Sequence, residues 1–193
     1  MAEHKRELLD TLDDFAGHIL ILSGSPGAGK TTTAEKLARL PGPTPKVHIH
    51  SDDFWGYIKH GVIDPWLPEA DAQNRMIMEI AAGVAGRYAR GGYFVAFDGV
   101  IGPWSLPPYL ALDVPMHYIV LRPSVEESVA RCVARGGDSL GDPVVVADVY
   151  RMFADLGPYE RHVLPSNGLD PEQTLAAVIA AMRSGDYRLR DLA

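Results

Sequence analysis

Cysteine is almost absent from this chain, and long apolar runs are missing altogether. The one cysteine, Cys132, cannot form an intramolecular disulfide or a cysteine-based metal site. No apolar run reaches the roughly 18 residues that a membrane-spanning helix needs, and no apolar signal core follows the charged N-terminal residues. These absences exclude a disulfide-stapled or membrane-spanning protein, and we expect a cytoplasmic one.

Positive charge is also scarce. The 193 residues contain 18 Lys and Arg against 25 Asp and Glu, which gives a formal net charge of −7. Because nucleic acids and anionic membranes attract basic surfaces, this balance argues against either as a partner. With 47% hydrophobic and 22% charged residues, the chain has the length and composition of one globular domain, which we assign to residues 1–193.

Five short apolar runs alternate with segments of helical character. We expect strands at residues 18–22, 47–50, 93–97, 116–121 and 162–164. We expect helices at residues 3–15, 31–40, 69–90, 124–135, 143–156 and 170–183. This alternation predicts an α/β fold in which helices cover both faces of a parallel sheet.

A glycine-rich segment after the first expected strand has the Walker A pattern for phosphate binding. It consists of Gly24, Ser25, Pro26, Gly27, Ala28, Gly29, Lys30 and Thr31. Glycines let successive N–H groups point at phosphates, and the N-terminus of the following helix adds unpaired donors. We expect this loop, with Thr32, to bind a nucleotide, Lys30 to reach its β- and γ-phosphates and Thr31 to ligate Mg²⁺. The alternative is a chance glycine-rich turn.

Acidic residues follow the second and third expected strands. Asp52 and Asp53 come directly after residues 47–50, and Asp98 closes residues 93–97. The loops at the carboxyl ends of parallel strands surround the ligand crevice, so these carboxylates should meet the glycine-rich loop. At least one of Asp52 and Asp53 is expected to accept a proton from a substrate hydroxyl, with helix capping as the alternative. Asp98 is expected to hold Mg²⁺ through water or to bind substrate, with a turn role as the alternative.

Two histidines precede the acidic turn. His48 and His50 alternate on a strand, so both face the same side of the sheet. A metal site made of these two histidines alone is not expected, and we interpret them as packing or hydrogen-bonding residues.

Arginine dominates the cations, and two arginines lie where a lid is expected. Arg131 and Arg135 are four residues apart, so they share one helix face, and a glycine- and aspartate-rich hinge follows them. A mobile lid over residues 136–157 would place arginines on phosphate oxygens and exclude water. The alternative is a solvated helix face on which they pair with Glu127 or Asp138.

The remaining sequence does not fit a guanine-specific switch or a motor. A base reader of the Asn-Lys-x-Asp type is missing, since Asn74 and Asn167 are the only asparagines and neither precedes a lysine. A motor usually has a longer chain and an acidic pair after its second nucleotide-contacting strand, where this sequence has the single Asp98.

With these motifs placed, the chain resembles the small P-loop kinases over nearly its whole length, among them gluconate kinase, chloramphenicol phosphotransferase, the zeta toxin and the phage polynucleotide kinase. The residues that carry the resemblance are Gly24–Thr31, the turn Ser51-Asp52-Asp53-Phe54, and the pair Arg131 and Arg135. The resemblance implies a three-layer αβα P-loop domain with a five-stranded parallel sheet and a short lid, which uses ATP and Mg²⁺. It further implies that Asp52 rather than Asp53 is the catalytic base, that Arg131 stacks on adenine near residues 166–168, and that Arg135 acts catalytically from the lid.

The segment expected to face the acceptor, residues 54–75, matches none of these relatives closely enough to transfer a substrate. Candidate substrate residues in this region and after the third strand are Asp53, Trp55, Arg75 and Trp104. Aromatic rings there can stack on a sugar or another ring, with packing inside the loops as the alternative for the tryptophans.

The sequence therefore predicts an ATP- and Mg²⁺-dependent phosphotransferase that acts on a hydroxyl of a small polar molecule. A nucleotide-binding regulator or slow ATPase without an acceptor substrate is the alternative. A third interpretation is a polynucleotide 5′-kinase or a toxin that phosphorylates a nucleotide sugar.

Overall fold

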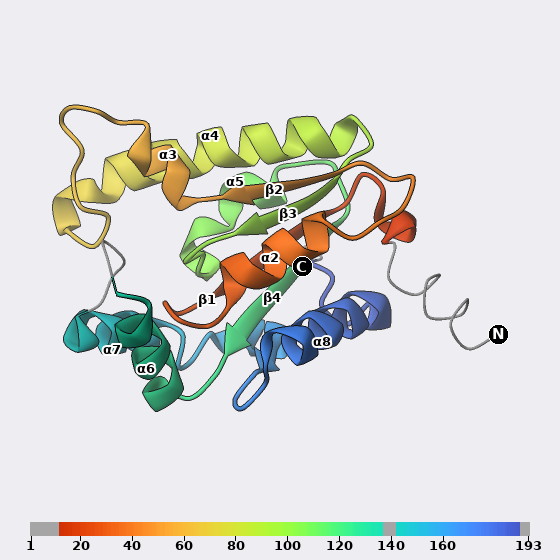
Figure 1. The fold of residues 1–193 in the computed structure, drawn as a ribbon. Coiled ribbons are helices and arrows are strands. Elements are labelled where there is room, and N and C mark those ends of the chain that lie inside the picture. The colour runs from red at the N-terminus through yellow and green to blue at the C-terminus, as the bar shows by residue number, and fades with distance from the viewer. Residues whose placement is uncertain (1–11, 137–141, 190–193) are drawn as a thin grey trace.

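Five parallel strands form the centre of the protein. The computed structural model describes residues 12–136 and 142–189. The strands are β1 (Ile19–Gly24), β2 (Lys46–His50), β3 (Phe94–Asp98), β4 (Met116–Arg122) and β5 (Val163–Pro165), in the spatial order β2-β3-β1-β4-β5. All the pairings between these strands are parallel. Every strand therefore ends at the same edge of the sheet, on the left of Figure 1.

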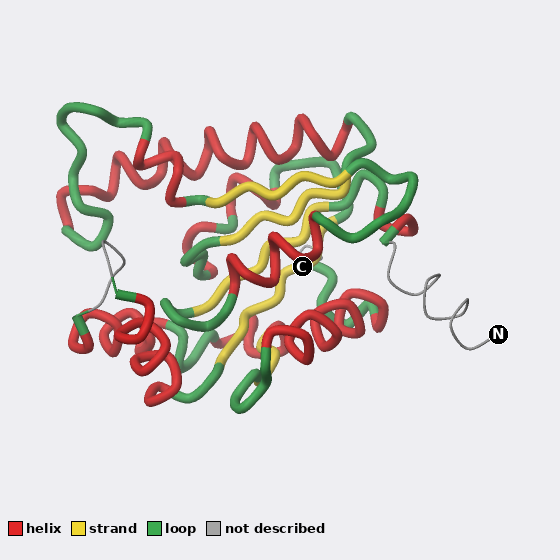
Figure 2. The backbone as a smooth tube through the Cα atoms, viewed as in Figure 1, coloured by secondary structure: helices red, strands yellow, loops and turns green. Residues whose placement is uncertain are grey.

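Helices cover both faces of this sheet (Figure 1 and Figure 2). α4 (Asp71–Arg90) and α5 (Pro107–Leu110) pack on one face, and α2 (Lys30–Ala38) and α8 (Pro171–Ser184) pack on the other. Three helices border the carboxyl edge of the sheet: α3 (Asp52–Gly56), α6 (Val125–Arg135) and α7 (Pro143–Met152). The described residues thus form the three-layer αβα arrangement that the sequence predicts.

The strands carry continuous apolar runs because both of their faces are buried. Ile19 and Ile21 of β1 pack in the core under α4, whereas Leu20 and Leu22 pack in the core under α2 and α8. Successive side chains of a strand point to opposite faces, so a sheet covered on both sides needs apolar residues at every position.

Side-chain caps fix the starts of the helices near the carboxyl edge. The Ser124 hydroxyl accepts a hydrogen bond from Glu127 N at the start of α6, and Asp142 accepts one from Val144 N at the start of α7. Asp170 and Gln173 form a capping box at the start of α8. These caps determine where α6, α7 and α8 begin.

The five expected strands and the helices expected after residue 30 are confirmed with shifted bounds. α7 ends at Met152 rather than near residue 156, because Phe153 turns into the core. The sequence does not predict α5, although proline at its first positions suits the first turn of a helix. Of the helix expected at residues 3–15, residues 3–11 lie outside the described residues, and residues 13–15 form a single 3₁₀ turn. Among the described residues, no helix combines the length and apolar character needed to cross a membrane.

Candidate active site

The loop between β1 and α2 has a backbone that only glycine can adopt at several points. Gly24, Gly27 and Gly29 have φ angles of 137°, 77° and 90°. A Cβ at Gly24 would lie 2.3 Å from the carbonyl oxygen of Leu121, and one at Gly27 would lie 2.4 Å from that of Ser128. The loop is therefore packed against the start of α6, and its curvature is the one that a phosphate-binding loop requires.

Lys30 and Thr31 begin α2 directly after this loop. Lys30 is 8% exposed, and its Nζ donates a hydrogen bond to the carbonyl oxygen of Ser25 at 2.9 Å, across the loop. The Thr31 hydroxyl donates to Asp98 Oδ2 at 2.7 Å. Thr32 is exposed beside them. The lysine and the threonine of the Walker A pattern thus lie where phosphates and a metal ion would meet the loop.

Asp98 is the last residue of β3 and is completely buried. Besides the Thr31 hydroxyl, its carboxylate accepts hydrogen bonds from His48 Nε2 at 2.6 Å and from His50 Nδ1, which lies 3.2 Å from each carboxylate oxygen. Burial alone would raise the pKa of Asp98, but these three hydrogen bonds outweigh it and hold the pKa well below its usual value. Asp98 is therefore an ionised carboxylate fixed beside Thr31.

The two histidines of β2 have the hydrogen-bonding role expected of them. Because an ionised carboxylate only accepts hydrogen bonds, the proton lies on Nε2 of His48 and on Nδ1 of His50. The hydrogen bond to Asp98 raises the pKa of His50, burial opposes that shift, and the negative charges of Asp98, Asp52 and Asp53 add to it. His50 also approaches Asp52, with 3.5 Å between Nε2 and Oδ2.

Asp52 and Asp53 are the first two residues of α3. The N-cap is Ser51, so the alternative interpretation of Asp52 as the capping residue is wrong. The Asp52 side chain is 67% exposed, and its Oδ1 accepts a hydrogen bond from the Ser51 hydroxyl at 3.0 Å. Asp53 is also exposed. Of the two, Asp52 is the one connected to Asp98, through His50.

Arg131 lies between the phosphate loop and the segment after β5. Its guanidinium pairs with Glu127, donates to the carbonyl oxygen of Leu169 at 3.0 Å and lies 3.5 Å from that of Gly27. Glu127 in turn accepts a hydrogen bond from Gly168 N at 2.9 Å. The ion pair with Glu127, which the alternative interpretation of Arg131 predicts, is therefore present, and together with these contacts it holds residues 168 and 169 against α6.

The lid is only partly described. Arg135 is the last residue of α6, but its side chain lies outside the described part of the structure, as do residues 137–141 with Asp138. Arg151 of α7 pairs with Asp148 on its own helix. Of residues 136–157, which the sequence predicts to form a lid, the structure thus describes residue 136 and residues 142–157, including α7.

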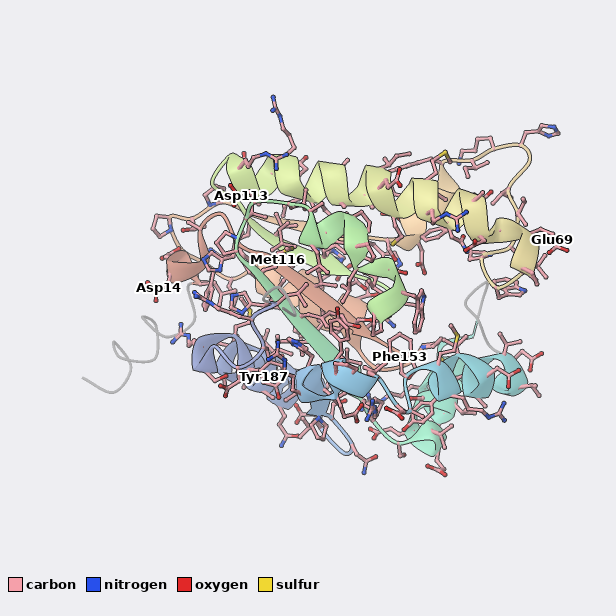
Figure 3. All side chains as sticks on the ribbon, turned by 180° about the vertical axis from the view of Figure 1, so that it is seen from behind. Asp14, Glu69, Asp113, Met116, Phe153 and Tyr187 are labelled. Carbon is pink, nitrogen blue, oxygen red and sulfur yellow. The ribbon has the colours of Figure 1, made fainter. Side chains whose placement is uncertain are left out.

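The four candidate substrate residues do not converge. Trp55 donates from Nε1 to Asn74 Oδ1 at 3.1 Å and packs against the core, as the packing alternative predicts. Arg75 pairs with Asp71 on the same helix. Trp104 is 54% exposed and stacks at a tilt on Phe153, whose place is labelled in Figure 3. Trp104 thus links the segment after β3 to the segment after α7.

A hollow of about 440 Å³ lies at the amino end of β4, away from this cluster. Its lining is formed by Leu110, Leu112, Asp113, Val114, Pro115, Met116 and Leu189. Apart from Asp113 its lining is apolar, and it lies at the opposite edge of the sheet from the phosphate loop, so the candidate site rests on the side-chain cluster at the carboxyl edge.

Several contacts of the site are not evident from the sequence. Ser128 Oγ lies 3.2 Å from Ser25 Oγ of the phosphate loop, and Glu127 joins two segments 41 residues apart. The spacing of His48 and His50 indicates a shared face but not their partner, because Asp98 is about 50 residues away and reaches them only through sheet pairing. No described group of three or more His, Cys, Asp or Glu is arranged to hold a metal ion by itself.

Comparisons with known proteins agree with this architecture. No protein-family model matches the chain, and no curated protein matches it in sequence. A gluconokinase from Sinorhizobium meliloti superposes with a TM-score of 0.64 at 16% identity, over 89% of this chain and 94% of that one. A sugar kinase from a Janibacter species superposes with a TM-score of 0.63 at 16% identity, over 86% of this chain and 94% of that one.

A third match extends the comparison to a larger protein. A chain of an RNA repair complex superposes with a TM-score of 0.53 at 20% identity, over 70% of this chain and only 43% of that one. Similarity at these identities concerns the fold. The arrangement of strands, phosphate loop and flanking helices is the αβα fold of the P-loop kinases.

Proposed function

We propose that the protein is an ATP- and Mg²⁺-dependent phosphotransferase that acts on a hydroxyl group of a small polar molecule. The observation that carries this proposal is the run of contacts from Thr31 through Asp98 and His50 to Asp52. It connects a phosphate-binding loop to a solvent-exposed carboxylate. A regulator that only binds nucleotide has no need of such a carboxylate, whereas a kinase needs one to receive the acceptor's proton. An ATPase would use the same carboxylate on water, and the blank without acceptor in the test below separates the two reactions.

The residues at the carboxyl edge divide the chemistry among them. The loop amides and Lys30 hold the phosphates, for which Lys30 exchanges its bond to Ser25 for the β- and γ-phosphate oxygens. The acceptor oxygen attacks the γ-phosphorus, the bond from that phosphorus to the β–γ bridging oxygen breaks, and ADP leaves. Asp52 takes the hydroxyl proton as the new bond forms.

Thr31 and Asp98 fit a magnesium site. A hydroxyl and an ionised carboxylate are hard oxygen ligands, and Mg²⁺ in such sites takes few protein ligands and completes its shell with phosphate oxygens and water. Mg²⁺ bound there would neutralise negative charge on the β- and γ-phosphates. In this proposal Thr31 ligates the ion directly and Asp98 acts through water.

Two arginines complete the proposed site. Arg131, held by Glu127 between the phosphate loop and residues 168–169, stacks on adenine. Arg135 acts from the lid on the charge that spreads over the transferred group. Trp104 is the aromatic candidate for contact with the acceptor, because it is exposed beside Phe153.

A polynucleotide 5′-kinase is the second candidate, and the match to a chain of an RNA repair complex favours it. Against it stands the net charge of −7, since binding to a nucleic acid strand depends on basic side chains. A test must therefore include both kinds of acceptor.

The proposal is tested by ADP release from MgATP over a panel of acceptors, each beside a blank without acceptor. The panel contains sugars, sugar acids, nucleosides, nucleotide sugars, hydroxylated antibiotics and a 5′-hydroxyl oligonucleotide. We expect one small-molecule class to raise release well above the blank. Asp52→Asn should lower the stimulated rate by about 10³-fold or more while nucleotide affinity stays within about threefold.

Lys30→Ala and Asp113→Asn are the matched controls. Lys30→Ala should abolish transfer and weaken nucleotide binding as well, whereas Asp113→Asn, an exposed carboxylate at the amino edge, should change neither. A high blank that no acceptor raises would contradict the proposal and indicate an ATPase. Normal transfer by Asp52→Asn would contradict the assignment of the base.

A further inference from the structure

His50 contacts a carboxylate with each of its two ring nitrogens. Its Nδ1 lies 3.2 Å from both oxygens of Asp98, and its Nε2 lies 3.5 Å from Oδ2 of Asp52. The ring is partly buried, with 28% of the side chain exposed. It therefore stands between the carboxylate beside the metal-binding threonine and the carboxylate proposed as base.

The two carboxylates differ in how firmly they are held. Asp98 has no exposed surface and accepts hydrogen bonds from Thr31 and His48 in addition to His50. Asp52 is 67% exposed, and among the described residues it contacts the hydroxyl of Ser51 in addition to His50. A short carboxylate side chain with so much exposure can change rotamer unless a neighbour restrains it.

The elements around Asp52 hold its main chain in place, since Phe54 and Trp55 of α3 pack against the core, but these contacts do not reach the Asp52 carboxylate. α3 has five residues, too few to be stable without tertiary contacts. It follows β2, which is an edge strand of the sheet. The backbone link at this point is a hydrogen bond from Ser51 N to the carbonyl oxygen of Asp98, at 2.8 Å. This bond places the main chain of the turn and leaves the direction of the Asp52 side chain to His50 and Ser51.

We propose that His50 is a positioning residue that fixes the Asp52 carboxylate relative to Asp98, and thereby the base relative to the metal and the γ-phosphate. This inference rests on the proposed kinase function. Phosphoryl transfer requires the attacking oxygen to lie in line with the leaving group. A base whose side chain changes rotamer therefore lowers the fraction of enzyme–substrate complexes that can react. His50 would keep the two carboxylates in one arrangement through both halves of its ring.

Two substitutions separate the two halves of the ring. In His50→Asn the side-chain amide stands at the position of Nδ1, so it keeps a donor for Asp98 and loses the reach to Asp52. In His50→Gln the amide stands at the position of Nε2, so it keeps the reach to Asp52 and loses the contact with Asp98. Each variant is the matched control for the other, since both replace the ring by an uncharged amide.

Three measurements are made on both variants. The first is kcat and KM with the acceptor found in the panel, at saturating MgATP. The second is the affinity for Mn²⁺ in the presence of ADP, measured by electron paramagnetic resonance, which requires no acceptor. The third is the rotamer of Asp52 in crystals grown with ADP.

For His50→Asn we expect kcat to fall by about tenfold with KM for the acceptor within about threefold, Mn²⁺ affinity unchanged, and Asp52 in a new rotamer. For His50→Gln we expect kcat within about threefold, Mn²⁺ affinity lowered by about three- to tenfold, and Asp52 in its original rotamer.

Identical behaviour of the two variants in all three measurements would overturn the inference, as would an unchanged Asp52 rotamer in His50→Asn. A wild-type protein that transfers to no acceptor would count against the proposed function alone. The Mn²⁺ affinity and the Asp52 rotamer would then still decide whether His50 positions the two carboxylates.

Discussion

The sheet carries a pair of histidines at each end, and the two pairs differ in their partners. At the carboxyl end, His48 and His50 both donate to the buried carboxylate of Asp98, and the pKa of His50 is raised by that hydrogen bond. At the amino end, His18 Nδ1 lies 3.1 Å from His117 Nε2 and the rings stack. Burial, helped by the neighbouring histidine and Arg188, lowers the pKa of His117 to about 4.

The difference comes from the neighbours of each pair. Phe15 packs edge-on against both rings of the amino-end pair, and the two rings contact each other. Figure 3 shows Asp14 and Asp113 near this end of the molecule and Glu69 near the other. A buried carboxylate thus gives the histidines at the carboxyl end an ionised hydrogen-bond partner, whereas the histidines at the amino end contact each other and a phenyl ring.

Removal of the Asp98 charge should have the largest effect on transfer, because it takes the carboxylate partner away from His48 and His50. An amide nitrogen in Asp98→Asn cannot accept the hydrogen bonds that Thr31 and the two histidines donate. We expect kcat to fall by about 10²-fold or more, with Mn²⁺ affinity down at least about tenfold, measured by transfer assay and paramagnetic resonance. Asp113→Asn is the control, and a loss below about threefold in Asp98→Asn would contradict the assigned role.

Because the pKa of His117 is lowered in the folded protein, the stability of the protein should depend on pH. The unfolded chain protonates His117 near pH 6.5 and the native protein only near pH 4, so between these values the unfolded state binds more protons. Stability should therefore fall as the pH drops from 7 to 5, and His117 should account for about 2 kcal/mol of that fall. Urea unfolding of wild type and His117→Gln at both pH values measures this share, and equal losses in the two proteins would contradict it.

The smallest effect is expected from a change at Glu127, the partner of Arg131. Glu127 pairs with Arg131 and accepts from Gly168 N, so Glu127→Gln weakens an ionic link without changing its shape. KM for ATP should rise by about three- to fivefold with kcat within about twofold, as steady-state kinetics would show. Glu126→Gln is the matched control, since Glu126 is the exposed neighbour of Glu127. Equal KM values for ATP in the two variants would contradict the role given to Glu127.

Much of the fold could be predicted from the sequence, because its signals are local. The runs 18–22 and 93–97 are apolar at every position, and this is what a strand buried on both faces needs. The glycines of the phosphate loop are fixed by close approaches to Leu121 and Ser128. Local signals also mislead: the prolines around residue 107 suggest a loop, yet α5 begins there.

The candidate site could be predicted only in part, since its key contacts are long-range. The sequence places Asp52 and Asp98 at strand ends, and parallel pairing of β2 with β3 brings them to one edge. The sequence does not reveal that His50 lies between these two carboxylates. That position depends on the register of β2 against β3, which pairs His50 with Asp98. Nor does the sequence reveal that Trp55 is held by Asn74 and packed on the core whereas Trp104 stays exposed, since both depend on long-range contacts.

The fate of the γ-phosphate tests the central claim most directly. Phosphorus NMR would follow MgATP with the protein and the pooled acceptors, with Asp52→Asn as the parallel sample. The account predicts that the γ-phosphate signal converts to a new phosphate ester together with ADP, and that Asp52→Asn stops this conversion. Conversion to inorganic phosphate alone, at the same rate with and without acceptors, would contradict it.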